Sequence, residues 1–318
     1  MISRRIIRIK VLQILYAFYT SPDKSINNTE KELFFSLQKT YDLYHLLLAL
    51  PVELVKYAES RIELRKNRHF PTEEDLNPNR RFVGNRLIAQ LRENEALNKY
   101  QERWKVSWVN EPELIQKLHH ELIEQDFFKL YMNSPEDSYT ADRELAEDIY
   151  TQIVFASEDM EGYLEEQSIY WNDDLDFVIG MVLKTIRRFK ETSSPEIALM
   201  PMFKNHEDEQ FAKDLYRKVV LNHEENYKIV QQHTVNWEVE RIAFMDILTL
   251  EMAITEFLYF PSIPTKVSLN EYIELSKYYS TEKSRNFING ILDKALKDLK
   301  KENKILKAGR GLIGETEQ

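Results

Sequence analysis

The stretch KVSLNEYIELSKYYSTEKSRNFINGILDK, residues 266–294, carries a strong helical signal. Its apolar residues recur at intervals of three and four, which predicts one helix over 266–279 and another over 281–304, with Ser280 or Thr281 as the N-cap of the second. Asn289-Gly290 alone would indicate a hairpin turn, but the helical spacing of apolar residues on both sides favours helix. The predicted buried residues are a combination of Val267, Leu269, Tyr272, Ile273 and Leu275, followed by Ile288, Ile291, Leu292, Ala295 and Leu299.

The rest of the chain indicates the same class of fold. Of its 318 residues only 7 are glycine, three of them among the last ten, and turn-rich β folds normally need more. Helical periodicity recurs between turn signals such as NPN at 77–79 and FPSIP at 260–264. We therefore predict an all-α protein, with further helices over about 30–50, 51–67, 80–103, 111–131, 140–156, 172–191, 207–233 and 236–258.

The N-terminal stretch RRIIRIKVLQILYAFY, residues 4–19, combines an apolar stripe with four cations. Helical geometry places Arg5, Ile9 and Tyr16 within about 40° of one another, as an exposed ridge with Arg8 on its flank. Cations that neutralise phosphates beside a ring that can stack on a base are typical of single-stranded RNA recognition. A tyrosine that packs in a helical interface is the alternative. The predicted core stripe is Ile7, Val11, Ile14, Leu15 and Phe18.

Charge is distributed unevenly along the chain. The formal net charge is −10, yet residues 1–20 carry +4 and residues 266–310 carry +5. Residues 311–318 carry −2, so that residues 21–265 carry −17. Binding to a polyanion requires local cationic surface rather than a basic average, because attraction is screened within about 10 Å. Lys294, Lys297, Lys301 and Lys304 predict a basic stripe on the last helix, for which ordinary solubilising lysines are the alternative.

Several classes of function are excluded or disfavoured. The chain has no cysteine, which excludes disulfides, thiolate catalysis and cysteine-based metal sites and fits a reducing cytoplasm. His119, His120 and Glu124 are interpreted as a solvated helix face rather than a metal site, because adjacent histidines point about 100° apart. The apolar run at 11–19 is far shorter than the ~20 residues of a membrane span, although an amphipathic membrane-surface helix stays open. We expect no enzymatic activity, no cofactor and no membrane partner.

Three blocks of the sequence resemble the NusB family of transcription antitermination factors. The first is the N-terminal helix with its Gln13-x-Leu15-Tyr16 element, and the second is VERIAFMDILTLEM at 239–252. The third is residues 266–294, with the N-E-x-I-E-L-x-K and F-I-N-G-I-L-D-K blocks. The resemblance covers residues 1–20 and about 211–300.

This resemblance implies an all-α protein of two packed helical bundles without catalytic activity. It implies binding to boxA-type single-stranded RNA together with NusE, the small-subunit ribosomal protein, within the RNA polymerase complex that transcribes ribosomal RNA operons. Carried onto this chain, it assigns NusE contact to Glu240 and neighbouring helices. It assigns RNA contact to Arg4, Arg5, Arg8, Tyr16, Lys283, Ser284, Arg285 and Phe287.

The chain also departs from the family pattern. Ile6 and Ile9 dilute the arginine-rich motif, and Lys283 replaces a common acid. The resemblance leaves the long acidic region unassigned. We predict N-terminal bundle helices at 1–50, an inserted acidic helical region at 51–205, a C-terminal bundle at 206–305 and a flexible tail at 306–318. NusB-like domains also precede cytosine methyltransferases, but this chain lacks the catalytic cysteine and the glycine-rich cofactor sheet. A helical protein-binding adaptor without RNA binding is the alternative.

Overall fold

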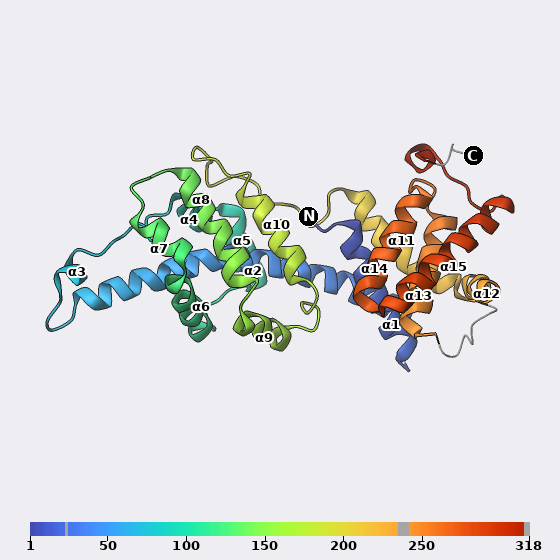
Figure 1. Cartoon of the computed structure of the whole chain (residues 1–318), viewed down its shortest axis with the longest axis horizontal. Coiled ribbons are helices and arrows are strands. Elements are labelled where there is room, and N and C mark those ends of the chain that lie inside the picture. The colour runs from blue at the N-terminus through green and yellow to red at the C-terminus, as the bar shows by residue number, and fades with distance from the viewer. Residues whose placement is uncertain (23–24, 235–241, 315–318) are drawn as a thin grey trace. The chain divides into compact units, whose positions relative to one another are not determined.

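The computed structural model describes residues 1–22, 25–234 and 242–314, apart from the side chains of Glu282 and Lys283. Over these residues the regular secondary structure is entirely helical, which confirms the predicted all-α class (Figure 1). The chain forms two compact units. Unit 1 comprises Met1 and residues Gln38–Met202, and unit 2 comprises Ile2–Leu37 and Phe203–Gln318.

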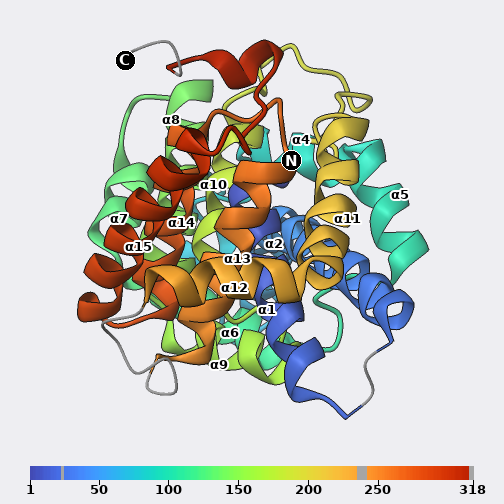
Figure 2. The ribbon, with the colours of Figure 1, turned by 90° about the vertical axis from the view of Figure 1, so that its right-hand side faces the viewer.

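Unit 2 is built around one almost completely buried helix, α13 (Phe244–Tyr259). Every residue of α13 from Asp246 to Phe257 is buried, as expected for a helix covered on all sides. Figure 2 shows α13 among the helices that pack against it. They are α1 (Arg4–Thr20), α11 (His206–Leu221), α12 (His223–His233), α14 (Thr265–Tyr279) and α15 (Glu282–Lys301).

The two C-terminal helices form as the sequence predicts. The N-cap of α15 is Thr281, whose hydroxyl accepts a hydrogen bond from the Ser284 N–H at 3.2 Å. All five predicted core residues of α15 are buried, and in α14 the buried members of the predicted set are Tyr272 and Leu275. Val267 is exposed. The helix α15 also runs through Asn289-Gly290, where a Cβ would meet open space, so no close packing explains the glycine.

Unit 1 contains most of α2 (Ile26–Lys66) and the helices that follow it (Figure 1). Its buried cluster extends along α2 from Leu43 to Ala58. The other helices are α3 (Glu73–Leu76), α4 (Arg86–Glu93), α5 (Glu95–Trp104), α6 (Pro112–Glu124), α7 (Asp126–Asn133), α8 (Tyr139–Asp148), the π-helix η1 (Ile149–Val154), α9 (Glu158–Gln167) and α10 (Leu175–Ile186).

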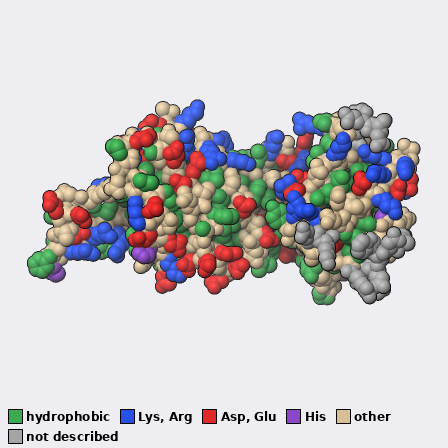
Figure 3. Space-filling model, in the orientation of Figure 1, with side chains coloured by type: hydrophobic (Ala, Val, Ile, Leu, Met, Phe, Trp, Pro, Cys, Tyr) green, Lys and Arg blue, Asp and Glu red, His purple; other side chains and the backbone are tan. Residues whose placement is uncertain are grey.

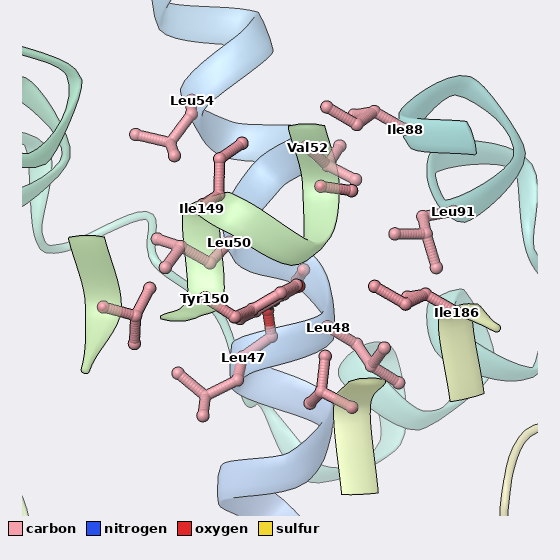
Figure 4. Close-up of a cluster of buried hydrophobic side chains, with 14 of the residues drawn as sticks. Leu47, Leu48, Leu50, Val52, Leu54, Ile88, Leu91, Ile149, Tyr150 and Ile186 are labelled. Carbon is pink, nitrogen blue, oxygen red and sulfur yellow. Dashed lines mark hydrogen bonds between the residues drawn. The ribbon is translucent and has the colours of Figure 1, made fainter. Parts of the chain in front are cut away.

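A single helix, α2, replaces the two helices predicted over 30–50 and 51–67. Pro51 lies inside it and has no N–H to donate to the Leu47 carbonyl four residues earlier. The Tyr150 hydroxyl from η1 donates to that carbonyl at 2.9 Å instead. Figure 4 shows the Tyr150 ring lying against Leu47, between side chains of α2, α4 and α10. Tertiary packing therefore compensates for the interior proline.

Other boundaries differ from the predictions where polar side chains cap a helix. Asn94 divides the predicted helix at 80–103, because its side-chain oxygen accepts from the Leu97 N–H at 2.9 Å and so begins α5. The predicted helix at 111–131 is likewise two helices, α6 and α7, and α9 was not predicted. Of the predicted helix at 236–258, the described part is α13.

We predict a flexible tail over 306–318. Its described part is packed against the segment that follows α13, within unit 2. The Lys307 ammonium donates to the Phe260 carbonyl at 3.0 Å, and the Ala308 N–H donates to the Pro261 carbonyl at 3.0 Å. A 3-10 turn, Gly309–Leu312, follows. A Cβ on Gly311 would lie 1.9 Å from the Pro261 carbonyl oxygen, so only glycine fits there. Among the described residues, no helix is both long and apolar enough to cross a membrane.

Candidate nucleic-acid interface

The helix α1 presents its cations to two different environments. Ser3 caps its N-terminus by accepting a hydrogen bond from the Ile6 N–H. The predicted core stripe is buried within unit 2. Arg5 is 47% exposed, whereas Arg8 and Lys10 are buried, at 3% and 1% exposure. Half of the positive charge of this stretch therefore lies inside the protein.

Arg8 occupies the centre of a buried polar network. Its Nε and one terminal nitrogen donate to the two carboxylate oxygens of Glu256 on α13, at 2.8 and 2.6 Å. Ser268 and Tyr272 of α14 donate to the same carboxylate, at 2.6 and 2.9 Å. Burial opposes ionisation of Glu256, but the charge of Arg8 and these hydrogen bonds outweigh it and lower the pKa of Glu256. The network therefore holds α1, α13 and α14 together.

The position of Arg8 corrects one structural prediction. We expected Arg8 on the flank of an exposed ridge, but the acceptor on α13 draws its guanidinium inward. Ile9, expected on the same ridge, is also buried. Arg5 and Tyr16 are exposed as predicted, with Tyr16 at 44%.

Arg4 and Arg5 make ion pairs at the surface of unit 2. Arg5 donates two hydrogen bonds to Glu271, at 2.9 and 2.8 Å, and the bond to Glu271 raises the pKa of Arg5. Arg4 donates to Asp208 at 2.8 Å and lies over the Phe211 ring at 5.0 Å. The Arg5 pair is exposed, and exposed pairs contribute roughly 0–1 kcal/mol, so a phosphate can compete for the Arg5 guanidinium.

Tyr16 lines an open groove of 640 Å³ in unit 2. Its ring lies 5.9 Å from that of Phe244, and Gln13 donates to the Tyr279 hydroxyl at 3.0 Å, which joins α1 to the end of α14. Tyr278 is 70% exposed. The groove therefore offers several aromatic faces to solvent; its lining residues are Tyr16, Ala243, Phe244, Met245, Tyr278, Tyr279, Ser280 and Thr281.

The start of α15 borders this groove through Ser280 and Thr281. Ser280 is hydrogen-bonded to Asp246 of α13, which fixes the turn between α14 and α15. Ser284, Arg285 and Phe287, three of the residues implicated by the family resemblance, follow within the first turns of α15 and are half-buried. The structure thus brings the beginning of α1 and the α14–α15 turn into one unit, although they are separated by more than 250 residues.

The structure does not describe two of the predicted site residues in full. Glu240, the predicted NusE contact, falls outside the described residues, and so does the Lys283 side chain. Conversely, Tyr278 and Phe244 were not predicted as site residues. The adjacent tyrosines before the cap of α15 were the available signal for Tyr278, since a helix cannot bury both of two neighbouring residues against one partner.

The basic stripe on α15 is partly neutralised. Lys297 pairs with Asp293 at 2.7 Å, Lys301 with Asp298 at 3.6 Å and Lys304 with Glu302 at 2.6 Å. Lys294 is exposed and has no ion pair with any residue that the structure describes. Most of this stripe therefore fits the ordinary solubilising role.

The acidic character of the chain belongs to one unit. Unit 1 has 20 lysines and arginines against 31 acids, a formal charge of −11, which leaves +1 for unit 2. Figure 3 shows the acidic side chains spread over the surface of the helices of unit 1.

No cluster of potential ligands among the described residues could hold a metal ion. His119 lies 5.0 Å from the Tyr57 ring, and mainly burial lowers its pKa to about 4.

Comparisons with known proteins agree with this architecture. The sequence profile of the NusB family matches residues 140–297. The transcription antitermination protein NusB of Salinibacter ruber is 40% identical over 139 residues, which cover 42% of this chain and 87% of that protein. The NusB of Chloroherpeton thalassium is 41% identical over 106 residues, covering 32% of this chain and half of its own length.

A third relative, the NusB of Desulfatibacillum aliphaticivorans, is 33% identical over 129 residues, covering 39% of this chain and 90% of that protein. No solved structure matches. These matches are to transcription antitermination proteins, and each covers less than half of the present chain. On the strength of nearly full-length coverage of such relatives, this chain belongs to the NusB family.

Proposed function

We propose that unit 2 binds boxA-type single-stranded RNA and that the protein acts with NusE as a transcription antitermination factor. In this proposal it joins the RNA polymerase complex on ribosomal RNA operons, in the cytoplasm, and promotes processive transcription. The single observation that carries the RNA assignment is the aromatic groove in which Tyr16 and Tyr278 are exposed, with Tyr16 on the helix α1 that also carries Arg5. Family membership supports the antitermination role.

The chemistry of the groove suits an unpaired strand. Exposed rings can stack on successive bases, which contributes about 1–3 kcal/mol per base. Arg4 and Arg5 both belong to α1, and Arg5 is held by an exposed ion pair with Glu271, from which a phosphate can displace it at little cost. The backbone N–H groups of the first turn of α15 add partial positive charge beside Ser284, and Lys283 and Arg285 flank Ser284 in sequence.

Arg8 has a different role in this proposal. With its guanidinium bound to Glu256, it positions α1, and therefore Arg5 and Tyr16, rather than contacting phosphate itself. Phe287 is half-buried. We propose that its ring either packs against the first turns of α15 or stacks on a base at the edge of the groove. We retain Glu240 as the proposed NusE contact, since it lies in the block that resembles the family.

The proposal is tested by fluorescence anisotropy with a labelled boxA-like single-stranded RNA, with NusE titrated. Arg5→Glu should weaken binding by at least tenfold and reduce its dependence on salt. Arg217→Glu is the matched control, because Arg217 is also an exposed arginine of unit 2 paired with a glutamate, Glu30. Equal affinities for Arg5→Glu and the unchanged protein would overturn the assignment of this surface.

A protein-binding adaptor is the second candidate function. Burial of Arg8 and Lys10 favours it, because it removes two of the four cations of α1 from any RNA surface. An adaptor would bind NusE with unchanged affinity in the presence and absence of RNA. It would show no RNA binding at any NusE concentration.

A further inference from the structure

The end of α2 in unit 1 carries a cationic cluster that the proposed function does not use. We define the α2 tip as residues 61–70, RIELRKNRHF, in which four lysines and arginines accompany one acid, Glu63. The net charge of +3 contrasts with the −11 of the unit to which it belongs. In Figure 3, lysine and arginine side chains gather beside the apolar and histidine side chains at this end of the unit.

Two of the cations in the α2 tip have no counter-charge among the residues that the structure describes. Arg61 and Arg65 are exposed, and neither forms an ion pair with any residue in the described part of the chain. They lie four residues apart on the same helix, where like charges destabilise a helix by about 0.2–0.5 kcal/mol. Burial is the main cause of the lowered pKa of His119, and the positive charges of Arg61 and Arg65 lower it further. A bound anion would relieve this repulsion.

The remaining cations are only loosely held. Lys66 approaches Glu63 at 3.7 Å, and Arg68 approaches Asp75 at 3.7 Å, distances too long for a hydrogen bond. Asp75 itself is committed to the capping box of α3, where it accepts from the Thr72 N–H. Outside the α2 tip, the exposed acids that come next in the sequence are Glu73 and Glu74, in the first turn of α3.

An apolar ring completes the α2 tip. Phe70 is 92% exposed, so its side chain contributes almost nothing to the hydrophobic core of unit 1. Leu64 is 63% exposed on the last turns of α2. An exposed ring in the same ten-residue segment as two arginines without an ion pair to any described residue matches the combination that single-stranded nucleic acids require, with cations along the backbone and an aromatic face for a base.

We propose that the α2 tip is a second contact site for single-stranded RNA, with Arg61 and Arg65 on phosphates and Phe70 stacked on a base. This site goes beyond the proposed function, because it lies in unit 1 and outside the segments that resemble the family. An anionic membrane is the competing ligand. RNA fits better because one ring is sufficient for a base, whereas membrane-surface binding requires a continuous apolar helix face.

The test uses the full chain and a fluorescein-labelled, unstructured 30-nucleotide RNA in anisotropy titrations at several salt concentrations. Phe70→Ala should weaken binding by about 5- to 150-fold, the range expected for loss of one stacked base, and Phe70→Tyr should retain it. Arg61→Ala/Arg65→Ala should lower the slope of log K against log salt by about 1.4, since each phosphate contact on a single strand contributes about 0.7.

Matched controls come from the same unit. Phe155 is 58% exposed, so Phe155→Ala removes an exposed ring elsewhere. Arg92 pairs with Glu59 at 3.2 Å, so Arg92→Ala removes an arginine that already has a counter-charge. Neither control should change the affinity or the salt slope. If Phe70→Ala and the double arginine variant behave like the controls, the α2 tip is not an RNA site.

The second measurement separates this site from unit 2. Photo-crosslinking with 5-iodouridine-substituted RNA should label the peptide containing Phe70, also in an Arg5→Glu/Tyr16→Ala background. Labelling of the α2 tip without boxA binding by unit 2 would support this proposal while contradicting the proposed function. Crosslinks confined to unit 2 would overturn it. Loss of binding to phosphatidylserine vesicles in Phe70→Ala, with RNA binding intact, would overturn it in favour of a membrane ligand.

Discussion

Removal of the Arg8 guanidinium separates the structural from the RNA-binding cations of α1. In Arg8→Ala, Glu256 stays fully buried and keeps only the hydrogen bonds from Ser268 and Tyr272. Breaking a buried ion pair in this way costs about 3–5 kcal/mol. Arg8 also lies 5.2 Å from the centre of the Phe211 ring and 5.7 Å from that of Tyr272, and those contacts are lost as well. We therefore expect a loss of about 4–5 kcal/mol, a large part of the 5–15 kcal/mol typical of a whole domain.

The expected loss depends on pH with a definite sign. In the unchanged protein the pKa of Glu256 is lowered, so the stability due to its ionised form is present above pH 4.5 and is lost as the pH falls below that value. Without Arg8, burial dominates and raises the pKa of Glu256 above its unfolded value. The unfolding free energy of Arg8→Ala should then increase as the pH is lowered from 8 toward 5, because protonation removes the buried charge.

Hydrogen exchange of α1 and α13 peptides, followed by mass spectrometry at pH 7.5 and 5.5, measures this loss within unit 2 alone. Arg5→Ala is the matched control, since its exposed pair with Glu271 contributes at most about 1 kcal/mol. Arg8→Met/Glu256→Leu should be less destabilised than Arg8→Met, because no charge remains buried. Unchanged protection in Arg8→Ala, or equal losses in Arg8→Ala and Arg5→Ala, would refute the reasoning.

Further predictions concern the groove, the proline, a buried histidine and the C-terminal turn. Tyr16→Ala should weaken boxA binding by about 5- to 150-fold and Tyr16→Phe should not, as measured by anisotropy. Tyr150→Phe should lower the unfolding free energy by about 1–3 kcal/mol in urea titrations, and by less in a Pro51→Ala background, where residue 51 regains its N–H; an equal loss in both backgrounds would contradict the role given to Tyr150. Mainly through burial, the pKa of His45 is lowered to about 4, so the unfolding free energy of unit 1 should fall by at most about 1.4 kcal/mol per pH unit between pH 6.5 and about 4, an effect reduced in His45→Phe. Gly311→Ala should expose Lys307 and Ala308 to faster exchange, because its Cβ cannot fit beside Pro261.

The helical class and much of unit 2 were predictable because the apolar period is strong and local. The N-cap at Thr281 and the buried face of α15 follow from residues within one or two turns of each other. The continuity of α2 was not predictable in the same way. Its interior Pro51 is tolerated because the Tyr150 hydroxyl donates to the carbonyl of Leu47, from which it is separated by 103 residues.

The candidate site shows the same division between local and distant information. A helical wheel placed Arg5 and Tyr16 on an exposed ridge, and both are exposed. It could not show that Arg8 turns inward, because its acceptor, Glu256, lies 248 residues away and belongs to the central helix. Total net charge was also uninformative, since the acidic excess is confined to unit 1.

One anisotropy series decides whether the aromatic groove lined by Tyr16 and Tyr278 binds single-stranded RNA. A labelled boxA-like RNA is titrated with the full chain, with Tyr16→Ala/Tyr278→Ala and with the control Arg217→Glu, in the presence of NusE. We expect the double tyrosine variant to lose at least tenfold in affinity and Arg217→Glu to bind as tightly as the unchanged protein. Unchanged affinity in the double variant, with the groove intact by hydrogen exchange, would contradict RNA binding by this groove.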